Sequence, residues 1–159
     1  TVARLHKILG DGVAALTLYA GKAVFVLADT TFATKLIDQR YPDYRRILPK
    51  PAHNILVDRE IFTEAFDRSA VVLEKNRAAR VTIGRMITIH CQNNGEVASD
   101  EFESSYQGEP LEIGLNPDYM REAMAAVGGD EVEFGFTDKN GAVTMDGNGL
   151  RTLVMPVRI

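Results

Sequence analysis

The sequence predicts an α+β fold of repeated units, in which one helix accompanies three antiparallel strands and the helices lie on one face of the sheets. Three observations lead to this prediction. Apolar residues recur at helical spacing in three segments, each is followed by three segments with strand-like alternation, and Gly, Asn or Pro residues separate them. The period is roughly 45 to 60 residues. Two units joined through their sheets would form one domain with two helices on one face.

The first unit opens with a helix over residues 2–9, because its apolar residues recur at helical spacing. Asp11-Gly12 is expected to end this helix. The next segment alternates apolar and polar residues, which is typical of a half-buried strand, and Gly21-Lys22 is the expected hairpin tip after it. We expect strands over residues 15–20, 23–28 and 31–38.

The second unit begins with a strand over residues 52–57, followed by a helix over 58–73 for which Asp58 is the expected N-cap. Gly84-Arg85 separates two strands within residues 81–91, and a long strand follows over residues 96–106. The spacing predicts that the helix buries Phe62, Ala65, Phe66, Ser69 and Leu73.

The third unit repeats the pattern, with a strand over residues 110–115 and a helix over 117–127. Asn116 is the expected N-cap, and Pro117 suits the first helical position because proline has no N–H to leave unpaired there. Gly128-Gly129 is expected to end the helix. Three more strands are expected over residues 131–136, 142–146 and 150–159.

A stiff segment, residues 38–49, joins the first unit to the second, and we call it the seam. Pro42 and Pro49 each push the preceding residue out of the helical region, which favours an extended backbone. The seam also holds two tyrosines and three arginines, so we expect it to dock on both neighbours and to offer a partner a binding surface. The sequence therefore divides into residues 1–49 and a complete two-helix domain over residues 50–159.

Composition limits the possible classes of protein. The chain has 159 residues, 45% of them hydrophobic, with a formal net charge of -4, so it can bury a core and shows no overall basic bias toward nucleic acid. Cys91 is the single cysteine, which excludes an internal disulfide and fits a reducing compartment. No apolar run approaches the roughly 20 residues that span a bilayer. We expect a cytoplasmic protein without a membrane partner.

Motifs for cofactor and metal chemistry are absent from the sequence. There is no G-x-G-x-x-G, no G-x-x-x-x-G-K-[ST], no H-E-x-x-H and no G-x-S-x-G. His6, His53 and His90 are not spaced with acids or with Cys91 as a metal-binding set. We therefore expect neither a cofactor nor a metal.

Charged residues allow two interpretations each. Asp100 or Glu101 could serve a small hydrolase together with His90, but exposed acids on a strand also prevent edge pairing, and the alternation favours the second interpretation.

Basic residues lie on the polar sides of the three helices. They either form ordinary solvated faces or, if all helices share one side, a stripe that contacts phosphates without reading sequence. The residues in question are Arg4, Lys7, Arg68 and Arg121.

Three motifs resemble landmarks of one family. RYPDYRRILP in the seam, EIGLNPDYM before and in the last helix, and LVMPVRI at the chain end resemble the bacterial DNA polymerase III beta subunit, the sliding clamp, in the same order and at compatible spacing. The resemblance covers the whole chain and corresponds to the second half of the family's middle domain and all of its last domain. It implies that the chain is a shortened product of a longer clamp with the DNA clamp fold.

The resemblance implies a processivity factor without catalytic activity. The family forms a head-to-tail homodimeric ring that encircles duplex DNA, independently of its sequence, with helices lining the hole. It tethers the DNA polymerase III alpha subunit, the clamp loader and other proteins that carry a clamp-binding peptide motif. The alternative is a peptide-binding interaction module without a DNA function.

The resemblance also implies site residues. The peptide would dock in a groove between the middle and last domains, with apolar anchors in a pocket and polar contacts from Arg46, Asn116 and Tyr119 at its rim. Lys7 and Arg68 would face DNA, with weaker contributions from Arg4 and Arg121. The implied groove residues are Pro42, Arg46, Ile47, Asn116, Tyr119, Leu153, Val154, Met155, Pro156, Val157, Arg158 and Ile159. Gln39, Asn76 and Leu115 depart from common family residues and would tune this site.

Overall fold

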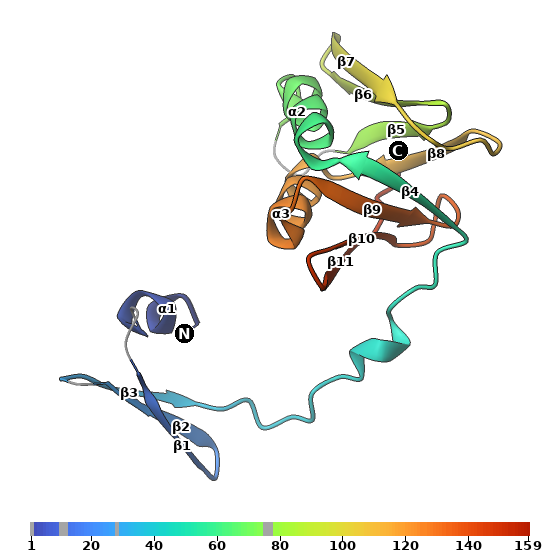
Figure 1. Cartoon of the computed structure of the whole chain (residues 1–159). Helices are drawn as coiled ribbons and strands as arrows, with labels where there is room; N and C mark the ends of the chain where they lie inside the picture. Colours follow the sequence, from blue (N-terminus) through green and yellow to red (C-terminus); the bar gives the residue numbers. More distant parts are fainter. Residues whose placement is uncertain (1, 10–12, 28, 75–77) are drawn as a thin grey trace. The chain divides into compact units, whose positions relative to one another are not determined.

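A computed structural model describes residues 2–9, 13–27, 29–74 and 78–159, without the side chain of Val2. The chain divides into two compact units, residues 1–43 and 44–159, whose internal structure Figure 1 shows. The boundary falls earlier than the 49/50 division expected from sequence and divides the seam evenly, with residues 38–43 in the first unit and 44–49 in the second. The expected helix end at Asp11-Gly12 and the family departure at Asn76 lie outside the described residues.

The first unit contains a helix and a three-stranded antiparallel sheet in the order β1-β2-β3, as the sequence predicts. Gly21 closes the β1-β2 hairpin with a φ of 78°, a conformation that favours glycine. Next to it, Lys22 lies opposite Tyr19, with its Nζ 5.0 Å from the tyrosine ring centroid. The elements are α1 (Val2–Leu9), β1 (Ala15–Tyr19), β2 (Lys22–Val26) and β3 (Thr31–Lys35).

The first unit buries very little apolar surface. Among its described residues, Ala23 is the one hydrophobic side chain that is fully buried, while Leu16 and Leu18 of β1 are more than half exposed. Folding free energy comes mainly from apolar burial, so this unit has little to stabilise it within the chain.

We expect the amide hydrogens of β1 to β3 to exchange with solvent at least about tenfold faster than those of the central strands of the second unit. Hydrogen exchange followed by mass spectrometry on the 159-residue chain measures this. Equal protection in the two units would show that the first unit has a source of stability that its buried side chains do not reveal.

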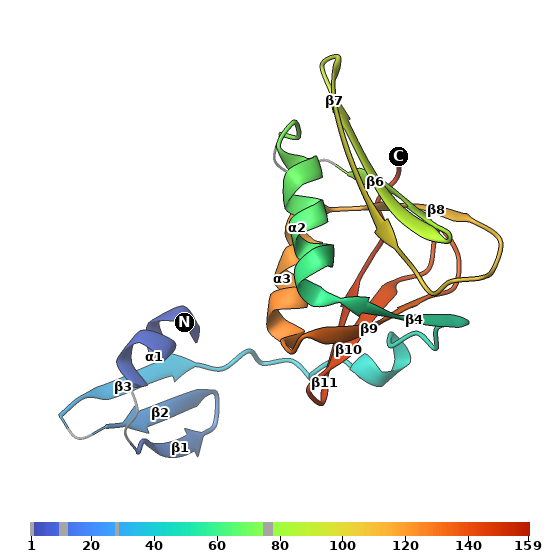
Figure 2. The same ribbon diagram turned by 45° about the horizontal axis from the view of Figure 1, so that its top comes forward.

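The described residues of the second unit form two α-helices, a short 3-10 helix and two four-stranded antiparallel sheets, ordered β11-β10-β9-β4 and β7-β6-β5-β8. Helices α2 and α3 lie side by side on the same side of the sheets (Figures 1 and 2). Helix α2 packs on β4, β6 and β7, and α3 packs on β10 and β11, which confirms the predicted two-helix architecture. The elements are η1 (Tyr44–Arg46), β4 (His53–Asp58), α2 (Arg59–Ala70), β5 (Ala79–Ile83), β6 (Met86–Asn93), β7 (Glu96–Glu103), β8 (Leu111–Leu115), α3 (Pro117–Val127), β9 (Glu131–Phe136), β10 (Val143–Gly147) and β11 (Leu150–Val154).

Local signals fix the start of α2 and the face that it buries. The carboxylate of Asp58 accepts a hydrogen bond from the backbone N–H of Ile61 at 2.9 Å, which confirms the predicted N-cap. Four of the five residues predicted to face the core are buried within the helix. The fifth, Leu73, lies beyond the helix end at Ala70 but still packs against the core.

Aromatic side chains from α2 and both sheets meet in the core of the second unit. The ring of Phe62 lies 5.0 Å from Phe66, 5.4 Å from Phe134 and 5.7 Å from Phe102, measured between centroids. Phe62 therefore connects the helix to a strand of each sheet. Cys91 lies in the same core, and burial raises the pKa of its thiol to about 11, in agreement with a role as a small core residue.

The last strand is shorter than the sequence predicts. It ends at Val154, and the tail, residues 155–159, leaves the sheet. Pro156 has no backbone N–H to donate to a neighbouring strand, which ends the pairing. The tail instead crosses β8, where the N–H of Val157 donates to the carbonyl oxygen of Gly114 at 2.9 Å.

Candidate functional site

A largely apolar cavity of about 550 Å³ lies between α3 and the chain end in the second unit, and we call it the groove. One wall comes from α3 and the other from the end of β11 and the start of the tail. An apolar, solvent-open cavity with a few polar groups suits a short peptide with aliphatic anchors. The lining residues are Tyr119, Glu122, Ala123, Thr152, Leu153, Val154, Met155, Pro156 and Val157.

Tyr119 lines the groove from the first turn of α3, which is capped by Asn116. The side-chain oxygen of Asn116 accepts hydrogen bonds from the backbone N–H groups of Asp118 at 2.9 Å and Tyr119 at 3.4 Å. The Tyr119 side chain remains 52% exposed, whereas Asn116 is 4% exposed. The Asn116 side chain is therefore largely buried and its oxygen caps the helix that carries Tyr119, while its polar contact at the rim stays a prediction.

We expect Asn116→Ala to lower the free energy of unfolding by about 0.5–2 kcal/mol, because the first turn of α3 loses its cap. Urea unfolding of the chain followed by circular dichroism measures this. Asn116→Asp is the matched variant, since aspartate caps helices as well as asparagine does. If Ala and Asp variants lose equal stability, the cap does not account for the role of this side chain.

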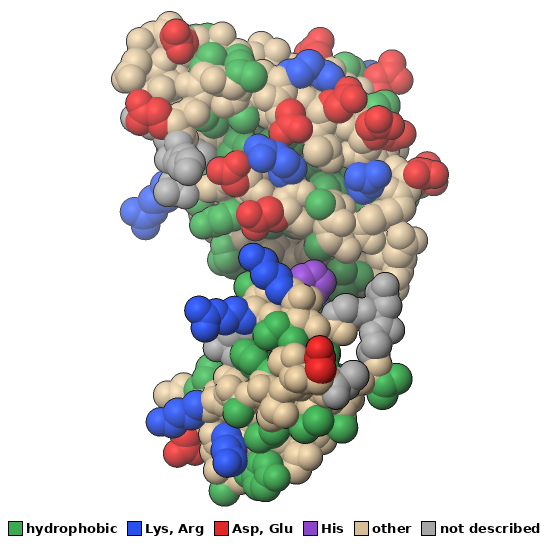
Figure 3. Space-filling view, turned by 90° about the vertical axis from the view of Figure 1, so that its left-hand side faces the viewer, with side chains coloured by type: hydrophobic (Ala, Val, Ile, Leu, Met, Phe, Trp, Pro, Cys, Tyr) green, Lys and Arg blue, Asp and Glu red, His purple; other side chains and the backbone are tan. Residues whose placement is uncertain are grey.

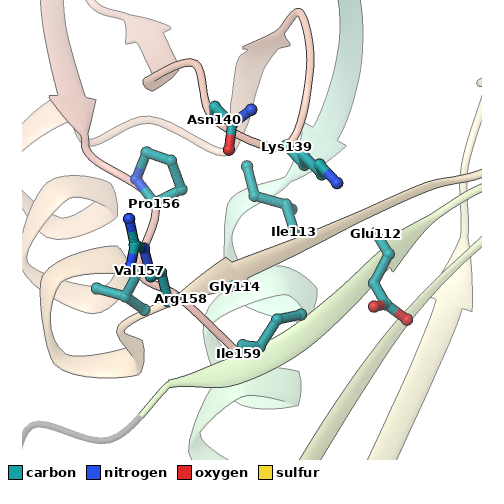
Figure 4. Close-up of a pocket in the computed structure, with 9 residues that line it drawn as sticks. All are labelled: Glu112, Ile113, Gly114, Lys139, Asn140, Pro156, Val157, Arg158 and Ile159. Carbon is teal, nitrogen blue, oxygen red and sulfur yellow. The ribbon is translucent and has the colours of Figure 1, made fainter.

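The structure places only some of the seven residues predicted at the chain end in the groove. Met155 and residues 153–154 line the groove, while Pro156 and Val157 line both the groove and a second cavity of about 470 Å³ on the other side of the tail. Arg158 and Ile159 do not line the groove; they line the second cavity (Figure 4) and also a third cavity. The predicted set of seven residues therefore spans two separate surfaces.

The seam residues do not line the groove in the second unit. Arg46 ends the short helix η1 and Ile47 follows it with an exposed side chain, and neither is among the lining residues. Pro42 belongs to the first compact unit. Their assignment to a peptide site remains a prediction.

Sequence reasoning missed Glu122, Ala123 and Thr152. The first two lie three and four residues after Tyr119 on α3, so helical spacing could have identified them as neighbours on the same face. Thr152 directly precedes the predicted segment on β11. Glu122 adds an acidic group to a groove that is otherwise mainly apolar.

Acids surround the arginines of α2 and α3. Arg68 forms ion pairs with Asp100 and with Glu64, the latter at 2.9 Å, and these hydrogen bonds raise the pKa of the Arg68 guanidinium. Arg121 forms ion pairs with Asp67 at 2.8 Å and Asp118 at 3.1 Å. Figure 3 shows Asp and Glu side chains interspersed with Lys and Arg over the second unit, in the upper part of the view. Both arginines are therefore locally neutralised, which weakens the prediction that they attract phosphates.

The basic residues of α1 have a different setting. Arg4 and Lys7 are exposed, and the helix Val2–Leu9 contains no acidic residue. Four basic residues are predicted to face DNA. Arg4 and Lys7 are the two whose own helix carries no acidic residue to offset their charge.

The structure removes Asp100 from the hydrolase interpretation, whereas Glu101, which pairs with Thr88, lies on the same face of the β6-β7 ladder as His90. Ile89 pairs with Asp100 and His90 pairs with Ser99, so Asp100 and His90 project from opposite faces of the β6-β7 ladder. Asp100 instead binds Arg68 on the side of the helices. Within the described part of the chain, no group of three His, Cys, Asp or Glu side chains could hold a metal ion, and no helix is long and apolar enough to cross a membrane.

Two adjacent helices on one side of two four-stranded sheets, with an apolar groove beside the chain end, define a clamp-type domain. Residues 45–158 match the family model of the DNA polymerase III beta subunit, C-terminal domain. The chain belongs to this family.

Individual relatives agree with this assignment. The beta sliding clamp of Pseudomonas aeruginosa is 34% identical over 136 residues, which cover 81% of this chain and 37% of the relative. The beta sliding clamp of Caulobacter vibrioides is 32% identical over 164 residues, which cover 98% of this chain and 44% of the relative. The solved structure of Caulobacter crescentus pol III beta matches with a TM-score of 0.92 at 28% identity, covering 99% of this chain and 45% of that one. The chain thus spans less than half the length of these relatives.

Proposed function

We propose that this chain is part of a sliding clamp, a non-catalytic ring that encircles duplex DNA independently of sequence and keeps other proteins on it. The observation that carries the proposal is the structural match to pol III beta over 99% of the chain. The proposed ring is a homodimer in the cytoplasm. Its proposed partners are duplex DNA, the DNA polymerase III alpha subunit, the clamp loader and other proteins with a clamp-binding peptide.

The groove is the proposed docking site for these peptides. Its apolar walls would receive aliphatic side chains, and the half-exposed Tyr119 would supply both an apolar ring and a hydroxyl group. Glu122 would disfavour acidic peptides at the same rim. Pro42, Arg46 and Ile47 of the seam remain proposed contributors from outside the described groove lining.

Lys7 is the proposed principal DNA contact among the four basic residues, because Arg68 and Arg121 are paired with acids. In a clamp that contains this chain, we expect Lys7→Gln to weaken retention on circular DNA and to lower the slope of log K against log salt by about 0.9 for each of the two subunits. Arg68→Gln should have a smaller effect, since its charge is already neutralised locally.

Lys139→Gln is the matched control for Lys7→Gln, because Lys139 is an exposed lysine in the β9-β10 connection and not on a helix. Retention is measured by gel filtration of the clamp on nicked circular and linearised DNA at several salt concentrations. If Lys7→Gln and Lys139→Gln reduce retention equally, α1 has no special role in DNA contact.

A peptide-binding module without a DNA function is the second candidate. The observation that favours it is the pairing of Arg68 and Arg121 with four acidic residues on and beside α2 and α3. The same retention experiment decides between the two. A protein that binds a Gln- and Leu-rich peptide but is retained equally poorly on circular and linear DNA would support the module and exclude the clamp.

A further inference from the structure

The tail approaches β8 closely at Gly114. The Val157 N–H donates to the Gly114 carbonyl oxygen at 2.9 Å, and Figure 4 shows the tail crossing the strand at this point. A Cβ atom at residue 114 would overlap the carbonyl oxygen of Val157, and would lie 2.6 Å from Cγ2 of Ile159 and 3.3 Å from the carbonyl carbon of Val157. The first and last of these atoms belong to the backbone, so a side chain at this position would displace the tail itself.

Glycine is required at residue 114 because neighbouring atoms leave no room for a side chain, and not because of its backbone conformation. Five described glycines have a positive φ, and Gly114 is not among them, so any residue could adopt its backbone conformation. A glycine in the interior of a strand weakens the strand and commonly marks the close approach of another backbone. The approaching backbone at Gly114 is that of Val157.

The position of the tail also sets the shape of the groove. Pro156 and Val157 form part of the groove wall, and they are also the residues that separate the groove from the second cavity, which Gly114 lines. Gly114 does not line the groove, so it can affect a peptide there only through the tail. The wall formed by α3 has a cap of its own at Asn116, two residues after Gly114.

We propose that Gly114 is a positioning residue of the peptide groove: its missing side chain allows the tail to lock onto β8, which holds the tail wall in the shape that binds peptide. This inference rests on the proposed peptide-binding function of the groove. It adds a positioning residue on β8, at a position outside the groove lining.

The test compares Gly114→Ala with Gly84→Ala in the 159-residue chain. Gly84 lies just after β5 in the same sheet, and a Cβ there would meet its nearest atoms, the Met86 carbonyl oxygen at 3.5 Å and Pro110 at 3.9 Å, at ordinary contact distances. We expect Gly114→Ala to weaken binding of a fluorescein-labelled Gln- and Leu-rich peptide by about tenfold or more, since overpacking a filled site displaces its neighbours. Gly84→Ala should bind as the wild type does. Equal affinity of the two variants would overturn the proposal.

Hydrogen exchange at Val157 gives a readout that needs no peptide. In the wild type this amide is bonded to Gly114, and we expect Gly114→Ala to speed its exchange by at least about tenfold while β9 stays protected. An unchanged rate in a folded variant would overturn the anchoring. A wild-type chain that binds no peptide would overturn the proposed function, and the exchange rate would still decide whether Gly114 anchors the tail.

A second pair of variants covers the case in which Gly114→Ala does not fold. Val157→Pro replaces the valine side chain by an apolar ring and removes the N–H that donates to Gly114, whereas Val157→Ala shortens the side chain and keeps the N–H. We expect the proline variant to bind the peptide about tenfold more weakly than the alanine variant. Equal binding by the two variants would show that the tail is held without this hydrogen bond, against the proposal.

Discussion

Tyr119→Ala is expected to weaken binding of a Gln- and Leu-rich peptide by about 2–4 kcal/mol, or roughly 30- to 700-fold. Among the described residues that line the groove, Tyr119 is the one with an aromatic ring, and it lies on a helix whose first turn is capped by the buried Asn116. A rigid aromatic side chain at such a site contributes a large contact area at a low entropy cost. Fluorescence anisotropy with a labelled peptide on the 159-residue chain measures the loss.

Two further variants show whether a loss of binding in Tyr119→Ala is specific to the groove and which part of the side chain causes it. Tyr19→Ala is the matched control, because Tyr19 has nearly the same exposure but lies on β1 of the other unit. Tyr119→Phe keeps the ring and removes the hydroxyl group, so it separates the apolar part of the contact from the polar part. If Tyr119→Ala and Tyr19→Ala bind equally well, the groove is not the peptide site.

Phe62→Ala is expected to lower the free energy of unfolding by about 3–5 kcal/mol, the usual cost of removing a buried phenylalanine. The Phe62 ring is 1% exposed and contacts aromatic rings from α2 and from both sheets, with centroid distances between 5.0 and 5.7 Å. Alanine would leave a cavity where these three elements meet. Urea unfolding followed by circular dichroism and by intrinsic tyrosine fluorescence measures the change.

Ile61→Ala is the control for Phe62→Ala. Ile61 is the preceding residue on α2, and its side chain is 48% exposed, so its removal should cost less than about 1 kcal/mol. A loss of similar size in both variants would mean that the aromatic core is not the main source of stability in the second unit.

The groove can be tested in the chain as it stands. Every residue that lines it belongs to the second compact unit, which also holds nearly all of the buried hydrophobic side chains. The first unit, with Ala23 as its one fully buried hydrophobic residue among those described, supplies neither the groove nor the core. Peptide binding therefore tests the proposed function without requiring a closed ring.

The sequence by itself determined the elements and the local features that start and orient them. Helical spacing located α2 and its buried face, Asp58 and Asn116 were recognisable as N-caps, and alternation located the strands. These features depend on residues within about four positions of one another, so a linear pattern contains them. The same local information, with three short motifs, also identified the family.

Only the tertiary structure decided how distant residues act on one another. It ended the last strand at Val154 and placed Val157 against Gly114, paired Arg68 with Asp100, and buried the side chain of Asn116. The Val157–Gly114 and Arg68–Asp100 contacts join residues more than 30 positions apart. Over such a separation, neither the periodicity of the sequence nor local propensity predicts which residues meet. These contacts arise because packed backbones compete for the same space and because a charge near the surface pairs with whichever opposite charge the fold brings within reach.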